Sequence, residues 1–128
     1  VSVIRRVYAD ITYHWPAQII ACLQSRVQTN VFVYEFGYTS QQRQLDRSGG
    51  AGHSEDAIWL FGGPELAADL GRRVEPVQER DSHLLSVFAG AVLNFVRSGA
   101  PTGSGSDWVP YMPGMNVAVI DEPELRVI

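Results

Sequence analysis

A long apolar segment, residues 82–98, constrains the fold of this chain more than any other sequence feature. Asp81 or Ser82 is suited to cap its first turn, and Gly99 followed by Pro101 ends the helix. Leucine, valine and phenylalanine cover most of its circumference. The remaining narrow polar stripe consists of Ser86, Gly90, Asn94 and Arg97. Since a helix this apolar is typical of a protein interior, we expect it to be buried in a larger structure.

Two segments have strand-like sequence. Residues 31–36 form a nearly continuous run of apolar, β-favouring residues, typical of a strand covered on both faces. Glu35 is the exception, and we expect it to face solvent near the end of the strand. A shorter and weaker strand is expected at residues 117–120.

Helical patterns occupy much of the remaining chain. The expected short helices lie at residues 1–10, 17–25, 54–61 and 65–73. The second helix should bury Ile20, Cys22 and Leu23. Trp15 should be extended, because a proline follows it. The third helix should pack through Ala57, Ile58, Leu60 and Phe61, and it should end at Gly62, Gly63 and Pro64.

The predicted fold class is α/β, with one or two sheet strands and several helices. These elements do not complete an α/β domain, whose sheet must be covered on both faces. We therefore expect residues 1–128 to be a segment of a single domain that is incomplete on its own. The chain opens on Val1 inside sequence that looks structured, which also indicates a fragment.

A glycine-rich turn presents one histidine, His53. The turn contains Gly49, Gly50 and Gly52, and glycine adopts backbone conformations closed to other residues. Asp56 follows His53 by about one helical turn, so both can lie on the same side of that turn. In open α/β sheets functional residues gather in loops beyond the carboxyl ends of strands. His53 follows the first predicted strand and so lies in the right kind of place, but this pattern alone is more typical of an ordinary surface or core histidine.

Five short motifs follow one another in a recognisable order. They are the aromatic strand at residues 31–37, Gly-His-Ser-Glu-Asp at 52–56, Trp-Leu-Phe-Gly-Gly-Pro at 59–64, Asn-Phe-Val-Arg-Ser-Gly-Ala-Pro at 94–101, and Trp-Val-Pro-Tyr at 108–111. The chain resembles the C-terminal part of the type B carboxylesterase/cholinesterase family over roughly residues 8–125. It departs from that family in the valine that interrupts the usual Trp-Pro-x-Tyr. The resemblance implies the C-terminal part of an α/β-hydrolase fold.

The resemblance also implies ester hydrolysis through a serine, a carboxylate and a histidine. Imidazole suits this chemistry because its ordinary pKa of about 6.5 lets it accept and return a proton near neutrality. His53 matches the family's catalytic histidine. Asp56 is interpreted as an acid that supports this histidine indirectly or that favours the start of the next helix. Four aromatic residues are candidates for lining an acyl or alcohol pocket, with core packing the favoured interpretation: Trp59, Phe61, Trp108 and Tyr111.

The nucleophile of such a triad is missing from the sequence. A hydrolase nucleophile lies in Gly-x-Ser-x-Gly, and no serine here has glycine two places away on both sides. Ser104 and Ser106 are interpreted as linker residues. Because the hydrolase order along the chain is serine, acid, histidine, the expected partners are an N-terminal portion of the same hydrolase and a small-molecule ester. The chain alone is expected to be inactive.

Other functions are disfavoured by composition. The net charge of −4 argues against nucleic acid as a partner, because phosphate binding needs clustered lysine and arginine. No apolar run approaches the ~20 residues that span a bilayer. His14 and His83 are separated from His53 and from any cysteine cluster, so we expect neither a metal nor a cofactor. Cys22, the single cysteine, cannot form an internal disulfide and should be a buried small hydrophobe.

Two alternatives to the enzyme remain. One is a non-catalytic cholinesterase-like adhesion or binding domain, since some members of the wider family lack catalysis. The retained His53 in a well-matched motif favours the enzyme. The other is a stand-alone domain of unrelated function, against which the apolar helix at residues 82–98 argues.

Overall fold

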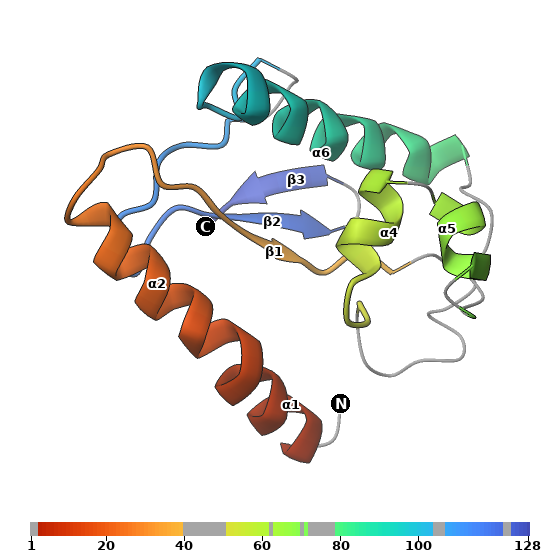
Figure 1. Cartoon of the computed structure of the whole chain (residues 1–128), viewed down its shortest axis with the longest axis horizontal. Helices are drawn as coiled ribbons and strands as arrows, with labels where there is room; N and C mark the ends of the chain where they lie inside the picture. The colour runs from red at the N-terminus through yellow and green to blue at the C-terminus, as the bar shows by residue number, and fades with distance from the viewer. Residues whose placement is uncertain are drawn as a thin grey trace.

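The computed structural model describes residues 3–39, 51–61, 63–69, 71, 79–103, 107–121 and 124–128. The elements, in chain order, are α1 (Val3–Ala9), the π-helical turn η1 (Asp10–His14), α2 (Trp15–Ser25), β1 (Val33–Phe36), α4 (Glu55–Phe61), α5 (Gly63–Asp69), α6 (Glu79–Ser98), β2 (Val117–Asp121) and β3 (Glu124–Val127). Figure 1 shows α6 lying across one side of a small sheet, with α4 and α5 near one end of it. The first three elements form one long helix on the other side of the sheet.

The sheet has the strand order β1-β2-β3, with β2 in the centre. β1 and β2 are parallel, in a register that pairs Tyr34 with Ala118, whereas β2 and β3 are antiparallel. Ala118 and Ile120 are fully buried, which makes β2 the most enclosed strand. The strand expected at residues 117–120 is therefore confirmed. It was expected to be the weaker of the two strands, and that expectation was wrong. β3 was not predicted at all.

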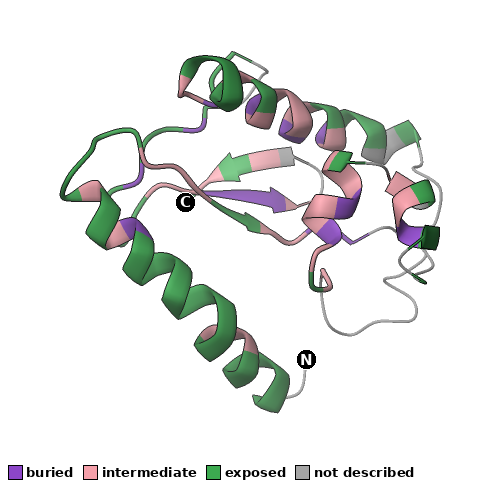
Figure 2. Ribbon diagram, in the orientation of Figure 1, coloured by how far each residue is buried: buried purple, intermediate pink, exposed green. Residues whose placement is uncertain are grey.

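Helix α6 covers the sheet with one face. Leu84, Phe88 and Ala91 recur at helical spacing, lie buried, and pack toward the sheet in two neighbouring core clusters. Its outer face is exposed among the described residues, since Val96 is 75% exposed and Leu93 is also exposed, so burial within a larger structure stays a prediction. Figure 2 shows the same division between a buried face and an exposed outer face. The described part of the chain provides no second layer for that outer face.

The predicted end of α6 is confirmed, whereas its start lies earlier than expected, at Glu79. Gly99 has a positive φ of 78° and donates its backbone N–H to the Phe95 carbonyl at 2.8 Å. A left-handed glycine directly after a helix is a common way to satisfy its last carbonyl groups.

The N-terminal helix runs through a proline without breaking. Trp15 was expected to be extended but is helical, with φ −62° and ψ −50°. The turn before it is π-helical, and the Trp15 N–H donates to the Asp10 carbonyl. A proline in a helix lacks a donor and crowds the carbonyl four residues earlier. We attribute the widened turn to this crowding by Pro16, since such insertions accommodate a break in the regular ladder.

The inward face expected for α2 is also corrected. Ile20 and Leu23 are exposed, Cys22 is half-buried, and Ala21 is the buried residue of this helix. The reason is that the described elements do not cover the long helix, which Figure 2 shows exposed along most of its length.

Helices α4 and α5 meet at the predicted glycine break. α4 ends at Phe61, and α5 begins at Gly63, whose φ is 54°. Ile58 is fully buried as expected, whereas Phe61 is 77% exposed, so its predicted packing is wrong. It lies at the last position of α4. Gly49 and Gly50 of the predicted glycine-rich turn lie outside the described residues.

Candidate active site

His53 lies exposed in a tight turn that enters α4. The Glu55 N–H donates to the Gly52 carbonyl at 3.1 Å, and the Ile58 N–H donates to the Ser54 carbonyl at 3.1 Å. Ser54 has a positive φ of 62°, an uncommon conformation for a residue with a Cβ atom. The helix was expected to include Ser54, but it begins at Glu55 because Ser54 turns the chain into it. The imidazole is thus carried by a short, hydrogen-bonded turn.

Asp56 lies in the first turn of α4 and accepts a hydrogen bond from Tyr34. The Tyr34 hydroxyl donates to Asp56 Oδ2 at 2.7 Å, which joins β1 to the start of α4. The position of Asp56 at the N-terminal end of the helix is the one predicted, where a carboxylate interacts favourably with the helix dipole. Its bond to a strand residue was not predicted.

The ring of Tyr34 is fixed from two directions. It packs against Phe88 of α6 with ring centroids 5.3 Å apart, and it makes an edge contact with Trp108 at 5.8 Å. Burial against these rings, together with the hydrogen bond to the Asp56 carboxylate and the charge of that carboxylate, raises the pKa of the Tyr34 hydroxyl above its ordinary value. Tyr34 therefore stays protonated as a hydrogen-bond donor through the neutral range.

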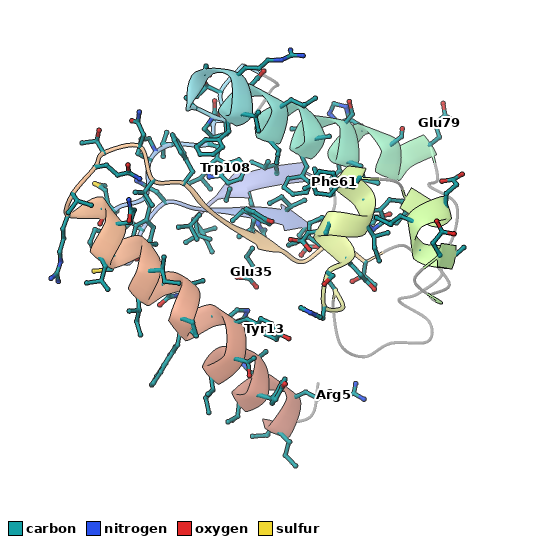
Figure 3. All side chains as sticks on the ribbon, in the orientation of Figure 1. Arg5, Tyr13, Glu35, Phe61, Glu79 and Trp108 are labelled. Atoms are coloured by element: carbon teal, nitrogen blue, oxygen red, sulfur yellow. The ribbon has the colours of Figure 1, made fainter. Side chains whose placement is uncertain are left out.

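Tyr13 lies beside the histidine. The rings of Tyr13 and His53 have centroids 5.4 Å apart and are tilted by 30°. Tyr13 belongs to the π-helical turn η1, so the long N-terminal helix reaches the candidate site through this residue. Figure 3 shows Tyr13 on the long helix and Glu35 pointing from β1 away from α6. Glu35 is exposed, as expected.

The candidate pocket residues lie in different environments. Trp59 is half-buried and makes an edge contact with Tyr38 at 5.9 Å. Trp108 and Tyr111 are buried, and the Trp108 indole N–H donates to the Val33 carbonyl at 3.1 Å. The core interpretation of Trp108 and Tyr111 is therefore confirmed. Phe61 is exposed, as described above.

Neither a metal cluster nor a membrane-spanning helix is found in the part of the chain that the structure describes. Within those residues no group of three or more histidine, cysteine, aspartate or glutamate side chains could hold a metal ion. No helix among them is long and apolar enough to cross a membrane. His14 forms a 2.9 Å contact with Asp10 on the exposed N-terminal helix, and His83 is exposed on α6.

Sequence reasoning missed Tyr13 and Tyr34. Tyr34 lies 22 residues before Asp56, and no local spacing rule connects a strand residue to a helix at that distance. The available signal was indirect, because Tyr34 lies in the strand that precedes the histidine turn. For Tyr13 the signal was its position before Pro16, where the helix must distort.

Comparison with known proteins identifies the family. The model of the carboxylesterase family matches residues 2–125. An esterase from anaerobic Clostridium hathewayi, described as able to hydrolyse aliphatic aromatic polyesters, has a similar structure, with a TM-score of 0.58 and 23% identity. The match covers 77% of this chain and 18% of that one. No curated protein matches significantly. The family and the structural neighbour indicate an α/β-hydrolase, of which the described residues form a three-stranded sheet and several helices.

Proposed function

Because the chain belongs to the carboxylesterase family, we propose that it supplies the acid–base histidine, His53, of a serine-dependent carboxylic-ester hydrolase. The observation that carries this proposal is the position of His53, exposed at the turn between β1 and α4. A side chain that must exchange a proton with a substrate needs such access, together with a backbone that holds it still.

In the proposed reaction a serine hydroxyl attacks the ester carbonyl while His53 accepts its proton. The protonated His53 then gives this proton to the departing alcohol, and an acyl-serine forms. Water repeats the sequence, with His53 as base toward the water and as acid toward the serine oxygen. A carboxylate bonded to the second ring nitrogen would orient the imidazole.

Asp56 is proposed to support His53 from the start of α4 and not to be the carboxylate of the triad. Its Oδ2 atom is already engaged by the Tyr34 hydroxyl. Tyr13, whose ring lies against the imidazole, would limit its rotation. Phe61 and Trp59 are proposed to face the acyl or alcohol group of the substrate. Phe61 is the more accessible of the two.

The serine and the triad carboxylate are proposed to lie on an N-terminal portion of the same hydrolase. The sequence contains no Gly-x-Ser-x-Gly. Within the described residues β1 has a strand neighbour on one side only. Many large apolar side chains of the long N-terminal helix are exposed, including Val3, Ile4, Ile11, Trp15, Ile19, Ile20 and Leu23. An apolar surface of this kind is typical of an interface that another part of a protein covers.

A fluorophosphonate probe, which reacts with activated serines, tests the proposal directly. The hydrolase that contains this chain should take up one adduct on a serine outside these 128 residues and should hydrolyse small esters. His53→Ala should abolish both reactions, and the matched control His83→Ala should leave both unchanged. Wild-type turnover by His53→Ala would remove His53 from the mechanism. A preceding portion that is present but not labelled would favour the adhesion or binding domain.

A further inference from the structure

We infer that Tyr34 is the positioning residue that holds the His53 turn in place, acting through its hydrogen bond to Asp56. This inference rests on the proposed role of His53. It adds that a strand residue, remote from His53 in the sequence, sets the position of the imidazole. Two observations support this. Asp56 accepts a hydrogen bond from Tyr34 on the sheet, and the backbone from Asp56 back to His53 is short.

Tyr34 is held by the sheet and by two aromatic neighbours at once, while 37% of it is exposed. Its backbone is paired with the fully buried Ala118 of β2. Its ring contacts Phe88 on α6 and Trp108, and the Trp108 indole in turn donates to the carbonyl of Val33. The hydroxyl oxygen therefore has a defined location relative to the sheet.

The position of Asp56 in turn restrains the position of His53. Asp56 is three residues after His53, and the backbone between them is closed by the Glu55 N–H to Gly52 carbonyl bond. Ser54, between them, has a φ of 62°, a conformation that persists only where the surroundings hold it. Restraining Asp56 therefore restrains the turn, because the backbone that leads back to His53 is itself hydrogen-bonded.

The hydrogen bond from Tyr34 acts at the first turn of α4, whereas the apolar contacts of this helix lie further along it. Ile58 is buried, and Trp59 and Leu60 pack against the main core cluster, all of them further along the helix than Asp56. They restrain the body of α4. The Tyr34 hydroxyl donates to Asp56 in the first turn, which joins that turn to the sheet.

The test uses the complete hydrolase and the variant Tyr34→Phe, which keeps the ring and removes the hydroxyl. We expect kcat to fall about 10- to 100-fold with little change in KM, because small misplacements of a reacting group have effects of this order. Tyr111→Phe is the matched control, since it removes a hydroxyl that accepts the Gly114 N–H on another loop. Its kcat should stay within about twofold of wild type.

A double-mutant cycle separates positioning from general stability. Asp56→Ala should lower kcat about as much as Tyr34→Phe, and the double variant should be no slower than either, because both remove the same bond. Asp56→Asn should retain more activity than Asp56→Ala, since its amide oxygen can still accept the hydroxyl proton. If Tyr34→Phe fails to fold, the comparison of Asp56→Asn with Asp56→Ala still decides the question.

Each outcome has one meaning. If kcat is unchanged in Tyr34→Phe while His53→Ala is inactive, the positioning role is wrong and the proposed function stands. Losses that multiply in the double variant, or equal losses in Asp56→Asn and Asp56→Ala, also overturn the positioning role. If His53→Ala is fully active, the proposed function itself fails.

Discussion

The strongest test of the packing is the replacement of Phe88 by alanine, with Phe95 as its control. Phe88 is 1% exposed and its ring contacts Tyr34 at 5.3 Å and Phe36 at 5.5 Å. Loss of the buried ring costs about 2–3 kcal/mol of transfer free energy. Two aromatic contacts add about 0.5–1.5 kcal/mol each. We therefore expect Phe88→Ala to lower the free energy of unfolding by about 4 kcal/mol, within the usual range for such changes.

Phe95 lies two helical turns further along the same side of α6, but 44% of it is exposed. It makes one ring contact, with Phe32 at 5.8 Å. We therefore expect Phe95→Ala to cost about 2 kcal/mol, half as much as Phe88→Ala.

Urea unfolding, followed by tryptophan fluorescence and extrapolated to water, measures both losses. The slope of the free energy with urea should be the same in the two variants, so that the comparison concerns stability alone. If the two variants lose the same free energy, Phe88 is no more deeply packed than Phe95, and the described core would be wrong.

Three further outcomes follow from single contacts. The pKa of Tyr34 is raised in the folded chain, so its contribution to stability is complete below the unfolded pKa of about 10 and is lost as the pH rises above that value. Urea unfolding between about pH 8 and 11 should show this decline in the free energy of unfolding. The same decline in a Tyr34→Phe variant would contradict the assignment to Tyr34. Ser54→Val should lower the free energy of unfolding by about 1–2 kcal/mol, because a β-branched residue is strained at a φ of 62°, whereas Ser54→Gly should not lower it. Equal melting temperatures of the two variants in calorimetry would contradict this. Trp108→Phe should cost about 1–3 kcal/mol because the Val33 carbonyl loses its donor, and an unchanged melting temperature would refute that role.

Much of the secondary structure could be predicted from local sequence. The strand at residues 31–36 became β1, the apolar segment at 82–98 became most of α6, and the glycine break separated α4 from α5. These signals are strong because each depends on neighbouring residues, either through hydrophobic periodicity or through the conformations open to glycine. The continuity of the N-terminal helix through Pro16 was not predicted, since it depends on one widened turn that has no clear sequence signal.

The sheet shows where local sequence stops being informative. β3 is short and forms by antiparallel pairing with β2, with Ala118 opposite Val127. Such a strand depends on a partner and not on its own propensity. The side of α6 that meets the sheet was not predicted either, because it depends on elements elsewhere in the chain.

The candidate site divides in a similar way. The three-residue spacing of His53 and Asp56 predicted that they share one helical turn, but His53 lies in the turn before α4 and Asp56 lies in the first turn of α4, with Ser54 at a positive φ between them. The catalytic role of His53 stays a prediction. The contacts of Tyr13 with His53 and of Tyr34 with Asp56 could not be predicted, because each joins separate elements.

The sequence by itself determined the family of this protein, the position of its strongest helix and strand, and the histidine turn, because all of these depend on residue type and short-range spacing. Only the tertiary structure decided that β2 is the centre of the sheet, that one face of α6 is buried, and that Tyr34 reaches Asp56. The physical reason is that burial and hydrogen bonding between distant segments depend on the folded path of the whole chain.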